Sequence, residues 1–242
     1  MRYKMVLSYD GTDYSGYQRQ PNAHTIQAAV EKAIFDMTKI ETEIFAASRT
    51  DKGVHALYQV VHFDTVADIE KESWISGLNK RLPSDIRVLK IHKVKPHFHA
   101  RHDSKSKVYL YKITKQEPSI FDQRFAVYVP NLDIKKMELA AQHLIGTHDF
   151  KAFAKLDTSE EKPTIRTLYT VSVKSYKTYY LFKIHGDHFL RYMVRSIMGN
   201  LIDIGLGRKQ PEHIKNLLAC KDRLLTSKTA PAKGLVLYHI YY

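Results

Sequence analysis

The sequence predicts an α+β protein in which antiparallel strands are covered by helices on one face. Short stretches that alternate apolar and polar residues indicate strands, and short turns between several of them favour antiparallel pairing. Longer stretches repeat apolar residues at helical spacing. With 242 residues, 44% hydrophobic and 26% charged, the chain fits one large domain or two intimate subdomains, and collagen-like and linker-dominated chains are excluded.

The first half of the chain begins with a strand at residues 4–9 and a loop punctuated by Gly11 and Gly16. An amphipathic helix follows at residues 26–37, with Thr25 as its expected N-cap. Beyond it we expect a second helix at residues 74–82 and strands at residues 44–48, 58–63 and 86–94.

The second half repeats this mixture of elements. Strands are expected at residues 108–114, 168–175, 180–185 and 235–241, and the middle two form a hairpin joined near Lys177. Helices are expected at residues 134–144 and 189–204. The polar run at 101–107 suggests a division into an N-terminal subdomain, residues 1–102, and a C-terminal subdomain, residues 103–242.

The cysteine content and the N-terminal residues bear on the cellular compartment. A single cysteine, Cys220, forms no internal disulfide and supplies no Cys-x-x-Cys pair, which excludes the disulfide-rich secreted class. Charges in residues 1–10 come too early for a signal-peptide core, and no apolar run is long enough for a bilayer. We therefore expect a cytoplasmic protein without a membrane segment.

The charge of the chain indicates a polyanionic partner. Lysine and arginine number 38 against 25 acidic residues, a net charge of +13. Residues 1–102 carry 15 basic and 12 acidic side chains, a net of +3, and residues 103–242 carry 23 and 13, a net of +10. A nucleic acid is one such partner, and the second half is expected to provide most of the phosphate-binding surface.

Residues 47–56 hold the densest group of reactive side chains. If the backbone stays extended between Arg49 and Asp51, the two side chains lie on the same face, where the guanidinium favours an ionised carboxylate. Such a carboxylate is able to act as a nucleophile at neutral pH. The alternative is a turn aspartate that caps backbone amides beside a surface arginine.

This segment resembles the catalytic signature of the TruA-type tRNA pseudouridine synthases, in the run Arg49-Thr50-Asp51-Lys52-Gly53-Val54-His55-Ala56. Five further segments match that family in chain order, at residues 9–20, 98–101 with 107–111, 146–150, 189–199 and 230–235. The chain departs from the usual signature at Ser48, where the family has glycine, and at Lys52, where alanine is common.

The resemblance implies an isomerase without a cofactor that converts uridine to pseudouridine, with Asp51 as the catalytic residue. The carboxylate attacks C1′ of the ribose, adds to C6 of the uracil, or assists proton abstraction from the ribose; the sequence leaves these three routes open. Arg49 matches the arginine that displaces the base and holds the extruded nucleotide.

Two further residues receive substrate-binding roles from the resemblance. Tyr109 matches a tyrosine that packs against the target base, although a strand aromatic in a core is the simpler interpretation of this residue alone. Arg195 matches an arginine that pairs with the catalytic carboxylate. The alternative is that Arg191 and Arg195, one helical turn apart, lie on a solvated face.

The resemblance also implies a homodimer in which two related α+β halves form one extended antiparallel sheet around a basic cleft. The implied substrate is tRNA, at uridines 38, 39 and 40 of the anticodon stem-loop. Two rival classes are a catalytically silent RNA-binding or RNA-chaperone protein and a carboxylate-dependent hydrolase. The presence of Arg49, Asp51, Tyr109 and Arg195 argues against the silent protein, and the order of the motifs argues against the hydrolase.

Four histidines lie close together in the sequence and suggest a metal site: His92, His97, His99 and His102. They lack helical His-Glu-x-x-His spacing and cysteine partners, and His99 falls in a matched segment of a family that uses no metal. We therefore expect no metal ion, and no small-molecule cofactor.

Overall fold

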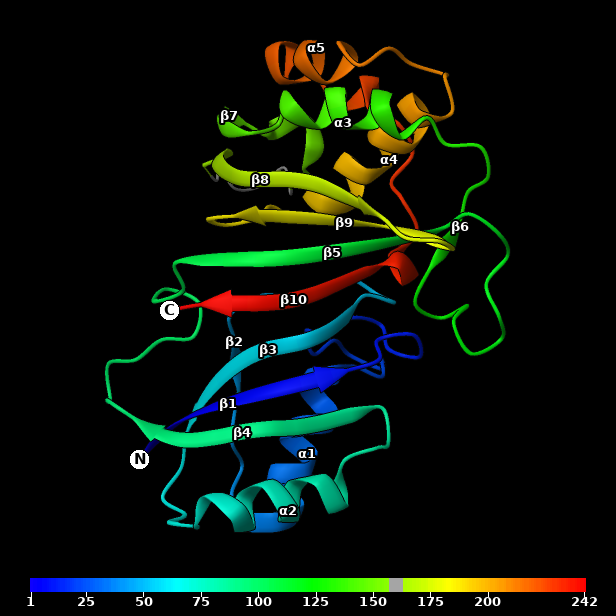
Figure 1. Cartoon of the computed structure of the whole chain (residues 1–242). Coiled ribbons are helices and arrows are strands. Elements are labelled where there is room, and N and C mark those ends of the chain that lie inside the picture. Colours follow the sequence, from blue (N-terminus) through cyan, green and yellow to red (C-terminus); the bar gives the residue numbers. More distant parts are fainter. Residues whose placement is uncertain (157–162) are drawn as a thin grey trace. The chain divides into compact units, whose positions relative to one another are not determined.

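The computed structural model describes residues 1–156 and 163–242, and divides into two compact units. The N-terminal unit comprises Met1–Lys105 together with Val236–Tyr242, and the C-terminal unit comprises Ser106–Leu235 (Figure 1). The last residues of the chain thus belong to the N-terminal unit, because they pair with one of its strands.

The sheet of the N-terminal unit is centred on β1 (Arg2–Tyr9), which pairs antiparallel with β3 (His55–Asp64) and with β4 (Ile86–Val94). A short strand, β2 (Phe45–Ala46), pairs antiparallel with β3. The last strand, β10 (Leu235–Tyr241), runs parallel to β3, with Val236 opposite His55. The expectation of antiparallel neighbours is wrong at this position, because β10 comes from the far end of the chain and not from a hairpin.

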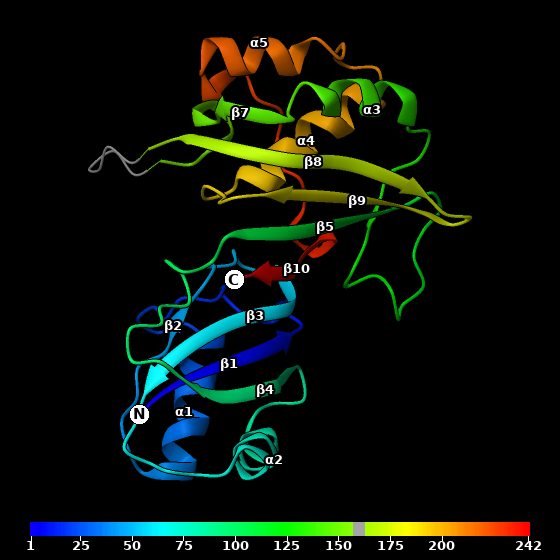
Figure 2. The same cartoon turned by 60° about the vertical axis from the view of Figure 1, so that its left-hand side comes forward.

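Two helices cover one face of this sheet, α1 (Ile26–Thr38) and α2 (Lys71–Arg81) (Figure 2). The hydroxyl of Thr25 accepts a hydrogen bond from Ala28 N, so the predicted N-cap is confirmed. Trp74 of α2 is fully buried, and its ring centroid lies 5.7 Å from that of Tyr3 and 5.8 Å from that of Phe63. Because side chains alternate along a strand, Lys4 and His62 point to the opposite, helix-free face.

The C-terminal unit holds a second antiparallel array in the order β5, β9, β8, β7. Its strands are β5 (Ser106–Thr114), β9 (Tyr179–Gly186), β8 (Ile165–Ser175) and β7 (Gly146–Asp149). The predicted hairpin is confirmed as β8 and β9. A two-residue strand, β6 (Val127–Tyr128), runs parallel to β5.

The helices of this unit are α3 (Ile134–Gln142), α4 (Met193–Gly205) and α5 (His213–Cys220), which lie together in Figure 1. The helix expected from residue 189 begins only at Met193. Tyr192 has φ 65°, and Met193 N donates to Leu190 O, so residues 190–192 form a turn and not helix. Short 3-10 turns occur at Lys151–Phe153, Arg223–Leu225 and Ala232–Gly234.

The α+β fold class is confirmed, with helices packed on mostly antiparallel strands in each unit. Two strands agree with their predicted ranges to the residue, Ile86–Val94 and Leu235–Tyr241. In the residues that the structure describes, no helix combines the length and apolar character needed to span a membrane.

Candidate active site

Asp51 lies in the turn between β2 and β3 of the N-terminal unit. Val54 N donates to Asp51 O at 3.1 Å, and Gly53 has φ 75°, a conformation that glycine adopts at little cost. The predicted turn at Asp51-Lys52-Gly53 is therefore confirmed. Asp51 is half-buried, and Lys52 is exposed, so its departure from the family signature places a charge in solvent.

Thr50 fixes the backbone between Arg49 and Asp51. Its side chain is buried and its hydroxyl lies 2.9 Å from the Tyr9 hydroxyl. Its carbonyl accepts a hydrogen bond of 3.0 Å from Tyr17 N. Hydrogen bonds thus hold both the side chain and the carbonyl of Thr50 in the interior. The flanking side chains lie closer to the surface, since Arg49 is exposed and Asp51 is half-buried.

Gln59 supports the residue before Arg49. Its amide is fully buried and donates to Ser48 O at 2.6 Å and to the Tyr9 hydroxyl at 3.3 Å. Ser48 is not among the residues with positive φ, so serine stands here without backbone strain. The substitution of the family's glycine at this position therefore leaves the turn intact.

Two glycines allow the opening loop to pack directly on the Asp51 turn. A Cβ on Gly11 would lie 2.1 Å from Val54 O, and one on Gly16, which has φ 103°, would lie 3.0 Å from Thr50 O. Gly11 N also donates to His55 Nδ1 at 3.1 Å. Sequence reasoning missed this supporting role, although the glycines of the loop and the histidine of the motif were its visible signals.

Tyr17 and Arg49 are electrostatic neighbours beneath this turn. Burial raises the pKa of Tyr17 well above its ordinary value, the nearby Tyr9 and Glu31 raise it further, and the positive charge of Arg49 opposes them. Tyr17 stays neutral at physiological pH and presents a rigid aromatic body to the base of the turn.

Tyr109 lies on β5 of the C-terminal unit, opposite Ile184 of β9. It is 6% exposed, and its ring meets that of Phe189 edge to face at a centroid distance of 4.9 Å. The ring is thus held in one orientation by a neighbour from another matched segment, residues 189–199.

Arg195 lies in the first turn of α4 and is hydrogen-bonded to Ala230. Its Nε donates to Ala230 O at 2.8 Å, and Ala230 N donates back to Arg195 O at 3.0 Å. The guanidinium carbon lies 5.3 Å from the ring centroid of Tyr192. Burial raises the pKa of Tyr111, and the charge of Arg195 opposes that rise, which places Arg195 near this strand residue.

Arg191 does not share a helical face with Arg195. It precedes α4, in the turn that Tyr192 closes, and its guanidinium carbon lies 5.5 Å from the Tyr192 ring centroid. The expectation that the two arginines lie one turn apart on one helix is therefore wrong, and Tyr192 instead lies against both arginines. Of the four expected site residues, Arg49 and Asp51 belong to the N-terminal unit and Tyr109 and Arg195 to the C-terminal unit.

A protein-family model described as tRNA pseudouridine synthase matches residues 5–103 and 140–242 of this chain. The chain belongs to that family. It is 43% identical to tRNA pseudouridine synthase A of Bacillus pumilus (strain SAFR-032), over all of this chain and 99% of that protein. It is 44% identical to the protein of the same name from Shouchella clausii (strain KSM-K16), over all of this chain and 93% of that protein.

The resemblance inferred from the sequence motifs is thus confirmed. As a member of the tRNA pseudouridine synthase family, the chain is an isomerase that converts uridine to pseudouridine in tRNA. This activity accounts for the net charge of +13, because a tRNA presents a phosphate at every nucleotide.

Proposed function

We propose that this synthase acts on uridines 38, 39 and 40 of the anticodon stem-loop, with Asp51 as its catalytic residue. The observation that carries this proposal is the Asp51 turn itself. Asp51 and Arg49 flank a buried Thr50 that Tyr9 and Tyr17 hold in place, and Gly11 and Gly16 pack the opening loop against it. A carboxylate fixed on such a rigid support is able to meet a nucleotide in one defined orientation.

The reaction balances without a redox partner. The bond from C1′ to N1 breaks, the uracil turns, C1′ bonds to C5, the proton leaves C5 and N1 gains one. Nothing is oxidised and no group is lost, so no cofactor is needed. Attack at C1′, addition at C6 and proton abstraction from the ribose all require Asp51 to be ionised.

Arg49 displaces the target base and holds the extruded nucleotide. A paired uridine presents its glycosidic bond poorly, and extrusion costs stacking energy that the enzyme has to replace. Arg49 suits this role because it is exposed and precedes Asp51 by two residues, with the buried Thr50 between them.

Tyr109 packs against the extruded uracil, and Arg195 pairs with the Asp51 carboxylate. An aromatic ring stacks on a base regardless of its sequence context, and the contact with Phe189 keeps the Tyr109 ring in place. The backbone and side-chain bonds to Ala230 fix the stem of Arg195, so its charge is preorganised for a carboxylate partner.

The active protein is a cytoplasmic homodimer in this proposal, and the basic surface of residues 103–242 holds the tRNA. A silent RNA-binding protein would have no need of the Asp51 turn, and a hydrolase would release a cleaved product. Product analysis therefore separates both rivals from the synthase.

The test is to incubate purified protein with a tRNA transcript that carries uridines at 38, 39 and 40, and to map pseudouridine nucleotide by nucleotide. We expect pseudouridine at these positions alone, with the chain intact. A matched transcript with cytidine at the three positions should remain unmodified. Modification elsewhere in the tRNA would overturn the assigned position, and a strand break would favour a hydrolase.

A further inference from the structure

The segment that follows β4 concentrates positive charge in the less basic half of the chain. Residues 86–102 contain five lysines and arginines and four histidines, with no acidic residue. Residues 1–102 as a whole have a net charge of only +3. The surface of the N-terminal unit therefore has one strongly cationic region, and Lys95, His97, Arg101 and His102 of that region are exposed.

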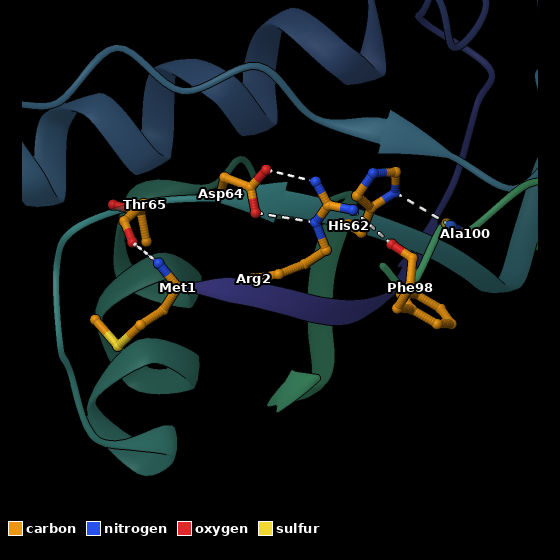
Figure 3. Close-up of polar contacts among 7 residues, drawn as sticks. All are labelled: Met1, Arg2, His62, Asp64, Thr65, Phe98 and Ala100. Carbon is orange, nitrogen blue, oxygen red and sulfur yellow. Dashed lines mark hydrogen bonds and ion pairs between the residues drawn. The ribbon is translucent and has the colours of Figure 1, made fainter. Parts of the chain in front are cut away.

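We call residues 95–103 the basic turn, and polar contacts hold its backbone to the N-terminal unit (Figure 3). Arg2 donates from Nη1 to Phe98 O at 2.9 Å, and its other nitrogens bind the Asp64 carboxylate at 2.6 and 2.9 Å. His62 Nδ1 accepts a hydrogen bond of 3.2 Å from Ala100 N.

The C-terminus of the chain closes the other side of the basic turn. The Tyr242 hydroxyl donates to Ala100 O at 2.6 Å, and Lys105 N donates to Tyr241 O at 2.8 Å. The turn is thus attached to β1, β3 and the end of β10. Its side chains extend from a fixed backbone, so binding of a ligand to them costs little backbone conformational entropy.

His99 of the basic turn and His62 of β3 act as structural acceptors. His99 Nδ1 accepts from the backbone N–H groups of Arg101 and His102, at 3.1 and 3.3 Å, as His62 Nδ1 does from Ala100. An imidazole nitrogen that accepts a backbone hydrogen bond has its lone pair engaged. Within the described part of the chain, no cluster of three or more histidines, cysteines or carboxylates is arranged to hold a metal ion.

The basic turn borders an open depression suited to an anion. Lys93, Val94, Lys95, His97, Phe98 and Asp103 line it, so two lysines stand against one carboxylate. Lys4 Nζ lies 5.2 Å from the Phe98 ring centroid and 3.8 Å from that of Tyr242. Burial lowers the pKa of Lys4, so a phosphate beside this lysine would offset the cost of its desolvation.

The basic turn and the Asp51 turn lie at opposite ends of β1. Tyr9 at one end contacts Thr50, and Arg2 at the other contacts Phe98. The strand has eight residues, so the two turns are separated by about 25 Å at about 3.3 Å per residue. The stem of a five-pair hairpin measures about 17 Å along its axis at about 3.4 Å per pair, so the basic turn lies beyond the far end of such a stem when the target uridine is at Asp51 and the stem runs along β1.

We propose that the basic turn, through Lys95, Arg101 and Lys4, binds the sugar–phosphate backbone of the tRNA at a point remote from the target uridine. This proposal rests on the proposed function, because it needs the target nucleotide at Asp51. The contact is independent of nucleotide sequence, and it distinguishes a complete tRNA from its isolated stem-loop.

The test compares the affinity of full-length tRNA and of an isolated anticodon stem-loop for the parent, Arg101→Gln and Arg101→Gln/Lys95→Gln proteins. One phosphate contact contributes about 0.9 to the slope of log affinity against log salt concentration. Relative to 1 M salt, one contact therefore strengthens binding at 0.1 M salt about eightfold, and two contacts strengthen it about 60-fold. We expect these losses for tRNA, with slopes reduced by about one and two, and no loss for the stem-loop. Arg101→Lys should restore most of the slope.

Arg81→Gln is the matched control, because Arg81 is an exposed arginine of the same unit that lies on α2, on the helix-covered face. It should bind tRNA as the parent does. Unfolding midpoints should be unchanged for Arg101→Gln, since the Arg101 contacts within the turn come from its backbone N–H and carbonyl.

Three results would overturn the proposal. Equal losses for tRNA and stem-loop, or no loss for either, would remove the basic turn as a remote contact. Dissociation of an oligomer by Arg101→Gln would assign the turn to a second copy of the chain. Binding is measured without turnover, so the two claims fail separately. If the parent makes pseudouridine and these variants bind tRNA normally, only this inference is refuted. A parent that makes none refutes the proposed function instead.

Discussion

Replacing Gly11 with alanine tests whether the opening loop positions Asp51. The added Cβ would lie 2.1 Å from Val54 O and 2.8 Å from Val54 C, where about 3.0 Å is the least that real contacts allow. The Val54 peptide or the loop therefore has to move by about 1 Å. Val54 N donates a hydrogen bond to Asp51 O, so a shift of Val54 also displaces the Asp51 turn.

A misplacement of about 1 Å in a catalytic group lowers the rate by about 100-fold. Overpacking of this kind also costs about 1–3 kcal/mol of stability, which leaves most of the protein folded. We expect Gly11→Ala to form pseudouridine about 100-fold more slowly than the parent in a single-turnover assay with excess enzyme, and to bind tRNA with similar affinity.

The matched control is Gly207→Ala. Gly207 has φ 73°, and apart from its chain neighbours no atom of the described residues lies within 4 Å of a Cβ built on it, so alanine there suffers only the backbone penalty of about 1–2 kcal/mol. It should lose stability and keep its rate. A Gly11→Ala protein with the parental rate and parental unfolding midpoint would refute the positioning role of the loop.

Substitutions at three further residues probe the aromatic and imidazole groups. Tyr109→Phe should keep much of the turnover and Tyr109→Leu should lose most of it, because only the ring stacks on uracil; equal small effects in folded protein would make Tyr109 a core residue. Tyr17→Phe should leave the free energy of unfolding unchanged or raise it by up to about 1 kcal/mol in urea titrations, since the buried hydroxyl has no hydrogen-bond partner among the described residues; a large loss would show a hidden partner. The pKa of His62 is lowered to about 4, mainly by burial, from about 6.5 in the unfolded chain. The unfolded state therefore takes up the proton first, and stability falls by up to about 3 kcal/mol as pH drops from 6.5 to 4. His62→Gln should reduce that dependence in urea titrations at pH 7 and pH 4, and an unchanged dependence would contradict the assignment.

The sequence predicted elements well where periodicity is strong and failed where tertiary contacts decide. The strand at residues 86–94 alternates apolar and polar side chains over most of its length, with breaks at Leu89 and Lys93, and matches β4 to the residue. The helix expected from residue 189 fails because its apolar spacing runs through a turn that Tyr192 closes in a left-handed conformation. Helix α5 was not predicted, and its eight residues are too few for a clear period.

The site shows the same contrast. The Asp51 turn was predictable because Asp51, Lys52 and Gly53 form a local turn signal. The supports of that turn were not, because Tyr9, Tyr17 and Gln59 reach it from distant positions in the chain. The parallel pairing of β10 with β3 is likewise a contact between the two ends of the sequence.

The substitution Asp51→Asn tests the central claim most directly. Asparagine keeps the shape and turn preference of aspartate and loses its charge and basicity. Asp36→Asn is the control, because Asp36 belongs to an exposed i,i+4 ion pair with Lys32 and should lose no activity. We predict that Asp51→Asn folds, binds tRNA with affinity near that of the parent and forms no detectable pseudouridine in a single turnover with excess enzyme. Appreciable pseudouridine from rigorously purified Asp51→Asn would remove Asp51 from the reaction.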